Sequence, residues 1–186
     1  MLVRAILRSW LALAAVVMVL LCPMVHAVSG PEKTALLTVV SDLYGRYAWV
    51  AVFSTKPPPD AVPLAQASRN ELGSIFVPEL AQAIWDDAQC AQRRHEICTV
   101  DFDLLFDSQD PSASDLTVQA DERGTTVLAC FKDGVGVRRC LTFVGAGVGG
   151  STKVADIVYP DQRSLRALLR VAKKAPPRQG NATTHR

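Results

Sequence analysis

The apolar pattern changes once along the chain, near Cys98, and this change constrains the fold more than any other feature. Before Cys98, apolar residues recur at steps of three and four, which is typical of amphipathic helices. After it, short stretches rich in β-branched and aromatic residues are separated by glycine or aspartate, which is typical of antiparallel strands. The order predicts an α+β fold: N-terminal helices packed on a curved antiparallel sheet in a cystatin-like cone, with a final C-terminal helix.

The helical half predicts a core helix followed by two shorter ones. The first runs from about Glu32 to Phe53, and its apolar stripe consists of Leu36, Leu37, Val40, Leu43, Tyr44, Tyr47 and Val50. Ser68 and Glu71 have the spacing of a capping box, so a second helix should begin there and bury Leu72, Ile75 and Phe76. Because proline suits a first turn, Pro78 predicts a third helix over residues 78–91. Its buried side comprises Leu80, Ala83, Ile84 and Trp85.

Four later stretches predict strands: residues 115–120, 125–131, 137–144 and 153–159. In the first, Leu116, Val118 and Ala120 alternate with two polar residues, as in a half-buried strand. The last element is a helix over residues 161–174 with an apolar side and a basic side. The basic side carries Arg163, Arg166, Arg170, Lys173 and Lys174.

Residues 1–27 have the order of a cleavable signal peptide. Arg4 and Arg8 precede an apolar run, and Val25-His26-Ala27 places small residues at a cleavage site. The strictly apolar run is shorter than the roughly 20 residues that a membrane-spanning helix needs. We therefore expect a periplasmic or secreted protein with no stable membrane span after cleavage near Ala27.

The charge of the mature chain is balanced but unevenly placed. Cleavage would remove two of the 20 basic residues and none of the 18 acidic ones, so the mature chain would have no net charge. This gives no reason to expect nucleic acid as a partner. Residues 162–186 hold seven basic residues and no acidic one. We expect a single α+β domain over residues 28–174 and a disordered basic tail over residues 175–186.

Export would leave four cysteines, an even number in a compartment where disulfides persist. Three connectivities are possible, but Cys130 and Cys140 flank a predicted hairpin. If residues 134–136 form its loop, the two cysteines face each other across the ladder. A two-residue turn at Asp133-Gly134 would shift the register and separate them. We prefer the three-residue loop, and Cys90 then pairs with Cys98 by elimination.

The segment from Asp101 to Asp110 interleaves four carboxylates with apolar residues. The acidic members are Asp101, Asp103, Asp107 and Asp110. Such a segment could hold a hard cation or supply a carboxylate for acid–base chemistry. Alternatively, its aspartates cap turns while its apolar residues fill the core. Because the glycine and terminal glutamate of a calcium loop are missing, we favour the structural role and expect no metal or other cofactor.

Asp156 is a second notable carboxylate, because strand alternation places it on the face of Val154 and Val158. An unpartnered carboxylate there would be costly, so we expect Arg163 or Arg166 of the final helix to pair with it. The glycine-rich stretch at residues 145–150 has the spacing of a dinucleotide fingerprint. A strand rather than a helix follows it, so we interpret it as a hairpin loop.

Three segments carry a family resemblance: residues 101–110, residues 154–159 and Ser164-Leu-Arg-Ala-Leu168. Together they resemble the YbjP-like family of bacterial exported proteins, a domain of unknown function, over roughly residues 33–172. Thr152 stands where that family's tryptophan is expected ahead of the Asp-Ile step. The resemblance implies an envelope location and association with other envelope proteins, and it implies no catalytic residues.

The functional hypotheses follow from what the residues can do chemically. No nucleophile–base arrangement stands out, so the leading hypothesis is an exported, non-enzymatic interaction protein, with an immunity or inhibitor protein as its specific version. Its candidate binding residues are the acidic segment, Asp156, and Arg163, Arg166 and Arg170. The alternative is a pocket enzyme or small-ligand-binding module, in which burial raises the pKa of Asp103 or Asp156.

Overall fold

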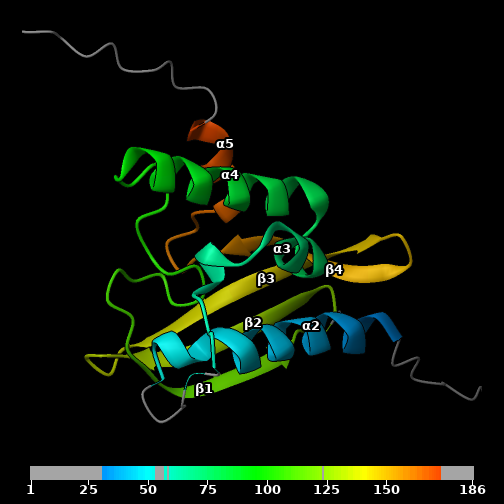
Figure 1. Ribbon diagram of the computed structural model, residues 1–186. Coiled ribbons are helices and arrows are strands. Elements are labelled where there is room, and N and C mark those ends of the chain that lie inside the picture. Colours follow the sequence, from blue (N-terminus) through cyan, green and yellow to red (C-terminus); the bar gives the residue numbers. More distant parts are fainter. Residues whose placement is uncertain (1–30, 53–56, 58, 123, 173–186) are drawn as a thin grey trace, which may run out of the picture.

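A computed structural model describes residues 31–52, 57, 59–122 and 124–172. The predicted signal peptide, the predicted tail, Phe53, Lys173 and Lys174 lie outside these ranges. The described helices are α2 (Pro31–Tyr47), α3 (Arg69–Ile75), α4 (Pro78–Arg94) and α5 (Leu165–Ala172). The strands are β1 (Ala113–Ala120), β2 (Thr126–Asp133), β3 (Arg138–Val148) and β4 (Ser151–Val158) (Figure 1). No helix in these ranges is long and apolar enough to cross a membrane.

The four strands form an open antiparallel sheet in sequence order, so the predicted α+β class is confirmed. Helix α2 lies along one face of the sheet and packs against β1, β2 and β4 (Figure 1). Its buried residues Leu36, Val40, Leu43 and Tyr44 supply one side of the core. The ring of Tyr44 meets that of Phe143 on β3 edge-on, with centroids 5.8 Å apart.

Helix α2 ends earlier than its apolar stripe predicts. The α-helix stops at Tyr47, and a 3₁₀ turn covers Ala48–Val50. The backbone N–H groups of Ala51 and Val52 both donate to the carbonyl of Ala48, which closes the helix end. The stripe is confirmed as a buried face, but a tightened last turn continues it after the α-helix itself has ended.

Helices α3 and α4 begin where the capping residue and the proline predict. The Ser68 hydroxyl accepts from the backbone N–H of Glu71 at 3.2 Å, while Pro78 occupies the first turn of α4. Between them, Phe76 bridges to Val154 and the Val77 N–H donates to the Val154 carbonyl at 2.9 Å. The α3–α4 junction therefore covers part of the β4 edge of the sheet, which limits further strand pairing there.

The β2–β3 hairpin has the predicted register. Cys130 lies opposite Cys140, and Gly136 has a φ of +83°, which suits glycine. The Asp133 N–H donates to the Val137 carbonyl, so alternation along the ladder puts the two cysteines in a non-hydrogen-bonded pair. Opposed side chains come closest in such pairs. Both predicted disulfides, Cys130–Cys140 and Cys90–Cys98, are present.

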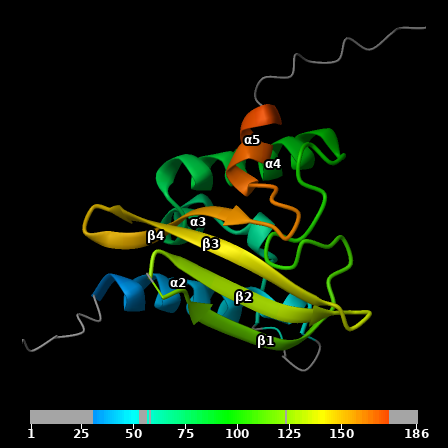
Figure 2. The ribbon, with the colours of Figure 1, turned by 180° about the vertical axis from the view of Figure 1, so that it is seen from behind.

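The β3–β4 hairpin corrects the expectation of a glycine-rich loop. Both strands extend beyond their predicted ends, and only Gly149 and Gly150 form the turn, with φ values of +57° and +81°. Gly145 lies within β3, where an added Cβ would come within 2.9 Å of a methyl carbon of Leu36. Glycine thus lets α2 approach the sheet closely. Figure 2 shows the opposite face of the sheet, with β2 and β3 in front of α2.

Candidate binding site

The acidic segment is built into the core by its apolar residues. Leu104, Leu105 and Phe106 are buried, as the structural interpretation predicts. The Tyr44 hydroxyl donates to the Leu105 carbonyl at 2.8 Å, and the Tyr159 hydroxyl donates to the Leu104 carbonyl at 3.4 Å. Burial raises the pKa of both tyrosines, so their hydroxyls remain protonated donors at neutral pH.

The carboxylates of this segment close local turns. Asp103 Oδ1 accepts from the Leu105 N–H at 2.9 Å, while burial raises the pKa of the Asp103 carboxyl. Asp101 accepts from the Gln109 amide at 2.9 Å, and Asp110 is exposed. Across the described residues, no three histidine, cysteine, aspartate or glutamate side chains gather closely enough to hold a metal ion.

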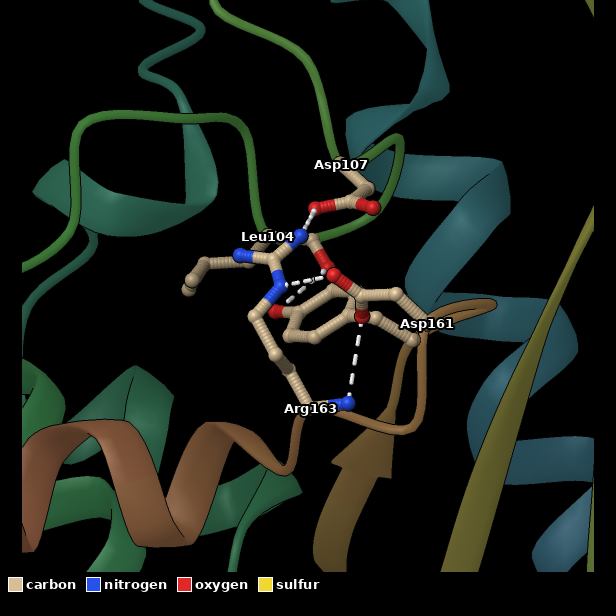
Figure 3. A network of polar contacts seen from close by, with 5 residues as sticks. Leu104, Asp107, Asp161 and Arg163 are labelled. Atoms are coloured by element: carbon tan, nitrogen blue, oxygen red, sulfur yellow. Dashed lines mark hydrogen bonds and ion pairs between the residues drawn. The ribbon is translucent and has the colours of Figure 1, made fainter.

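Arg163 joins the acidic segment to the start of α5 (Figure 3). Its Nη2 donates to Asp107 Oδ1 at 2.7 Å, and its Nε donates to Asp161. The bond to Asp161 is the main cause that raises the pKa of Arg163 above its usual range. The guanidinium also lies over the ring of Phe102, 5.1 Å from its centroid, and over that of Tyr159. The Arg163 guanidinium is therefore engaged in contacts within the protein, and it does not lie on the basic face of α5.

Asp156 is held by α5, but not by an arginine side chain, and this corrects the sequence prediction. Its carboxylate accepts from the Ser164 hydroxyl at 2.6 Å and from the backbone N–H of Arg166 at 3.0 Å. It also accepts from the N–H of Ile157 at 2.8 Å. The carboxylate satisfies donors at the start of the helix, where negative charge is favourable.

The strand face predicted for Asp156 is also wrong, because the register shifts beside it. Val144 pairs with Asp156 and Gly145 with Val154, which leaves Ala155 as an extra residue on β4. The shift lets Val154 and Ile157 both face the core, while Asp156 stays half-buried. Helix α5 itself begins four residues later than predicted, because Asp161–Ser164 form a turn in which Gln162 has a φ of +68°.

The remaining basic residues of α5 lie at the surface. Arg170 is exposed and Arg166 is half-buried. Within the described ranges, neither guanidinium takes part in an ion pair. Leu169 lies between them in the sequence and is buried. Among the described residues of the predicted basic face, these two arginines are available to a partner.

A groove of about 690 Å³ lies between α4, the 3₁₀ turn Leu64–Gln66, the segment after Cys98 and α5. Its apolar wall includes Ile84, Trp85, Ala88, Val100, Phe102 and Leu169. Gln66, Gln89 and Gln92 also line it. Among the described residues, Asp87 is the only ionisable one in the lining, and its Oδ2 accepts from the Val100 N–H at 3.2 Å.

The structure does not bring the candidate general bases to this groove. Phe102 and Leu104 line it, but Asp103 between them does not, and neither does Asp156. The sequence predictions missed the groove because they assigned Trp85 and Ile84 wholly to the core. One available signal was the continuation of the α4 stripe in small residues, Ala88 and Ala91, which leave space in front of a helix.

Comparison of the chain with protein-family models, with curated proteins and with solved structures finds no match in any of the three.

Proposed function

We propose that the chain is an exported, non-enzymatic interaction protein of the bacterial envelope, with an immunity or inhibitor protein as its specific version. The observation that carries this proposal is the use of the candidate catalytic groups as internal contacts. Asp103 accepts from the Leu105 N–H, and Asp156 binds the start of α5. Carboxylates that make such intramolecular hydrogen bonds stabilise the fold and are not presented to a substrate.

Export is supported by the signal-peptide pattern of residues 1–27 and by the two disulfides, which persist in oxidising compartments. The Cys90–Cys98 bridge ties the end of α4 to the segment that follows it, and Cys130–Cys140 joins two strands. The resemblance to the YbjP-like family and the cystatin-like arrangement remain part of this proposal. The packing of the long helix α2 across the antiparallel sheet supports the latter.

The surface that we assign to the protein partner is the exposed side of α5. Arg166 and Arg170 carry charge there without an ion pair inside the described part of the chain. A partner with an acidic patch would complement them, because charge complementarity speeds association and fixes register. The alternative is an enzyme that uses Asp103 or Asp156 as a base, but neither carboxylate lines the groove between α4 and α5.

Affinity capture from envelope extract tests the proposal. The tagged mature protein should retain a protein partner in stoichiometric amount, and Arg170→Glu should reduce the retained amount at least tenfold. Arg69→Glu is the matched control, because Arg69 is an exposed arginine on α3 and undergoes the same charge reversal. Equal loss with both variants, or no partner with the native protein, would contradict the assignment.

A further inference from the structure

We infer that the groove between α4 and α5 binds the apolar chain of a small amphiphile whose polar group carries no negative charge. This inference goes beyond the proposed function, since it concerns a small molecule and a surface other than the exposed arginines. It rests on the size of the groove, the composition of its wall and the contacts that hold the wall in place.

The size and shape of the groove suit a small molecule. Its volume of about 690 Å³ lies within the range of roughly 300–1,000 Å³ that small-molecule sites occupy. The wall is formed by aliphatic and aromatic side chains from four separate segments, including Val62, Ile84, Trp85 and Leu169. Burial of an alkyl chain against such a wall is favourable in proportion to the apolar area removed from water.

The polar lining selects against negative charge. Among the described residues, no lysine, arginine or histidine lines the groove, whereas the carboxylate of Asp87 does and accepts one backbone hydrogen bond from Val100. The amides of Gln66, Gln89 and Gln92 can each donate to and accept from a hydroxyl, ester or amide group. An anionic group buried here would have no cationic partner among the described residues and would pay its desolvation cost beside the Asp87 carboxylate. An alcohol or neutral ester would not.

The wall is held in place by contacts outside the groove. The Cys90–Cys98 disulfide and the Asp87–Val100 hydrogen bond fix the segment after α4 against the helix. Arg163 lies over the ring of Phe102, and the Tyr159 hydroxyl bonds to the carbonyl of Leu104. A pre-organised site loses less entropy when a ligand binds. The Asp107–Arg163–Asp161 network thus positions one wall of the groove.

Displacement of a fluorescent probe tests this inference with the full mature chain. N-phenyl-1-naphthylamine is neutral and apolar, and Trp85 in the groove wall can transfer excitation energy to it. We expect decan-1-ol to displace the probe, with affinity rising by up to about fourfold for each methylene from hexanol to decanol. Decanoate, which has the same chain length and a negative charge, should displace it at least tenfold more weakly.

Two groove variants and one control locate the site. Ala88→Arg introduces a charged side chain from α4, and Val62→Asp introduces one from the opposite wall, where Val62 is 41% exposed. Both should weaken probe binding at least tenfold. Ala167→Arg places the same new charge on an exposed position of α5 outside the groove lining, and it should bind like the native protein. Because Val62 is exposed, its variant tests the site even if Ala88→Arg fails to fold.

Three results would overturn the inference. The first is equal displacement by decan-1-ol and decanoate, which indicates non-selective surface partitioning. The second is native-like binding by both groove variants. The third is an apolar peptide that competes for the probe while decan-1-ol does not, which makes the occupant a macromolecule. Failure of partner capture together with selective decan-1-ol binding would instead contradict the proposed function and leave this inference standing.

Discussion

Replacement of Asp156 by alanine removes the acceptor at the start of α5. The Asp156 carboxylate accepts hydrogen bonds from the Ser164 hydroxyl at 2.6 Å and from the Arg166 N–H at 3.0 Å. A hydrogen bond to a charged group contributes about 1.5–3 kcal/mol to stability, and half-burial places these bonds near the lower end. The two bonds together predict a loss of about 3 kcal/mol, which corresponds to roughly 6–12 °C in melting temperature for a domain of this size.

Two further variants distinguish these two hydrogen bonds from an ion pair between Asp156 and the Arg166 guanidinium. Arg166→Met keeps the backbone N–H that bonds to Asp156, so its effect should stay below about 0.5 kcal/mol, as for most surface substitutions. Ser164→Ala should cost about 1–2 kcal/mol, because the hydroxyl also accepts from the Ala167 N–H as a helix cap. Thermal and urea unfolding measure these values. The reasoning is refuted if Arg166→Met destabilises the protein as much as Asp156→Ala, since the guanidinium would then be the partner.

Three other predictions follow from particular contacts. Peptide mapping under non-reducing conditions should recover Cys90 linked to Cys98 and Cys130 linked to Cys140, and any crossed pair would contradict the β2–β3 register. Gly145→Ala should destabilise by about 1–3 kcal/mol, because its Cβ would lie 2.9 Å from a Leu36 methyl carbon. Gly147→Ala is the control, because its Cβ would meet nothing within 4 Å and the change should be neutral or stabilising. If urea unfolding shows the same loss of stability for both variants, α2 does not approach Gly145 closely. Because burial raises the folded-state pKa of Asp103 above its ordinary value of 3.8, its contribution to stability is greatest below that pH and is lost as pH rises through the raised value. As pH rises through this range, the melting temperature of Asp103→Asn should therefore rise relative to that of the native protein. A difference in melting temperature that does not vary with pH would contradict the burial of Asp103.

Local sequence patterns correctly predicted the elements whose boundaries or register depend on nearby residues. Ser68 caps α3 and Pro78 starts α4, because both act on backbone groups within their own turn. The hairpin around Gly136 brought Cys130 to Cys140, because a short loop fixes register without help from the rest of the chain. The sequence also predicted the buried face of α2, because its apolar stripe is continuous over four turns.

The strand face of Asp156 and the position of Arg163 depend on tertiary contacts, so local sequence patterns did not predict them. The extra residue Ala155 turns Ile157 into the core, and the register shift lies beside Gly145, where α2 approaches the sheet. Strand alternation alone therefore placed Asp156 on the wrong face. Likewise, Arg163 belongs to the basic side of an ideal helix, but the turn at Gln162 carries it away from α5 and onto Asp107.

The groove could not be predicted because it depends on how separate segments assemble. Its walls come from α4, α5, the turn at Leu64–Gln66 and the segment after Cys98, which are distant along the chain. A stripe of apolar residues on α4 predicts burial, but it does not say whether another element fills the space in front of Ala88.

The central claim is that the chain acts by binding a protein partner through the exposed side of α5. Native mass spectrometry of the complex captured from envelope extract tests it most directly, because it reports the mass and stoichiometry of the bound partner. The account predicts one discrete partner mass at a fixed ratio, which persists with Arg69→Glu and disappears with Arg170→Glu. An uncomplexed chain that converts a component of the extract, with the conversion lost in Asp103→Asn, would contradict it.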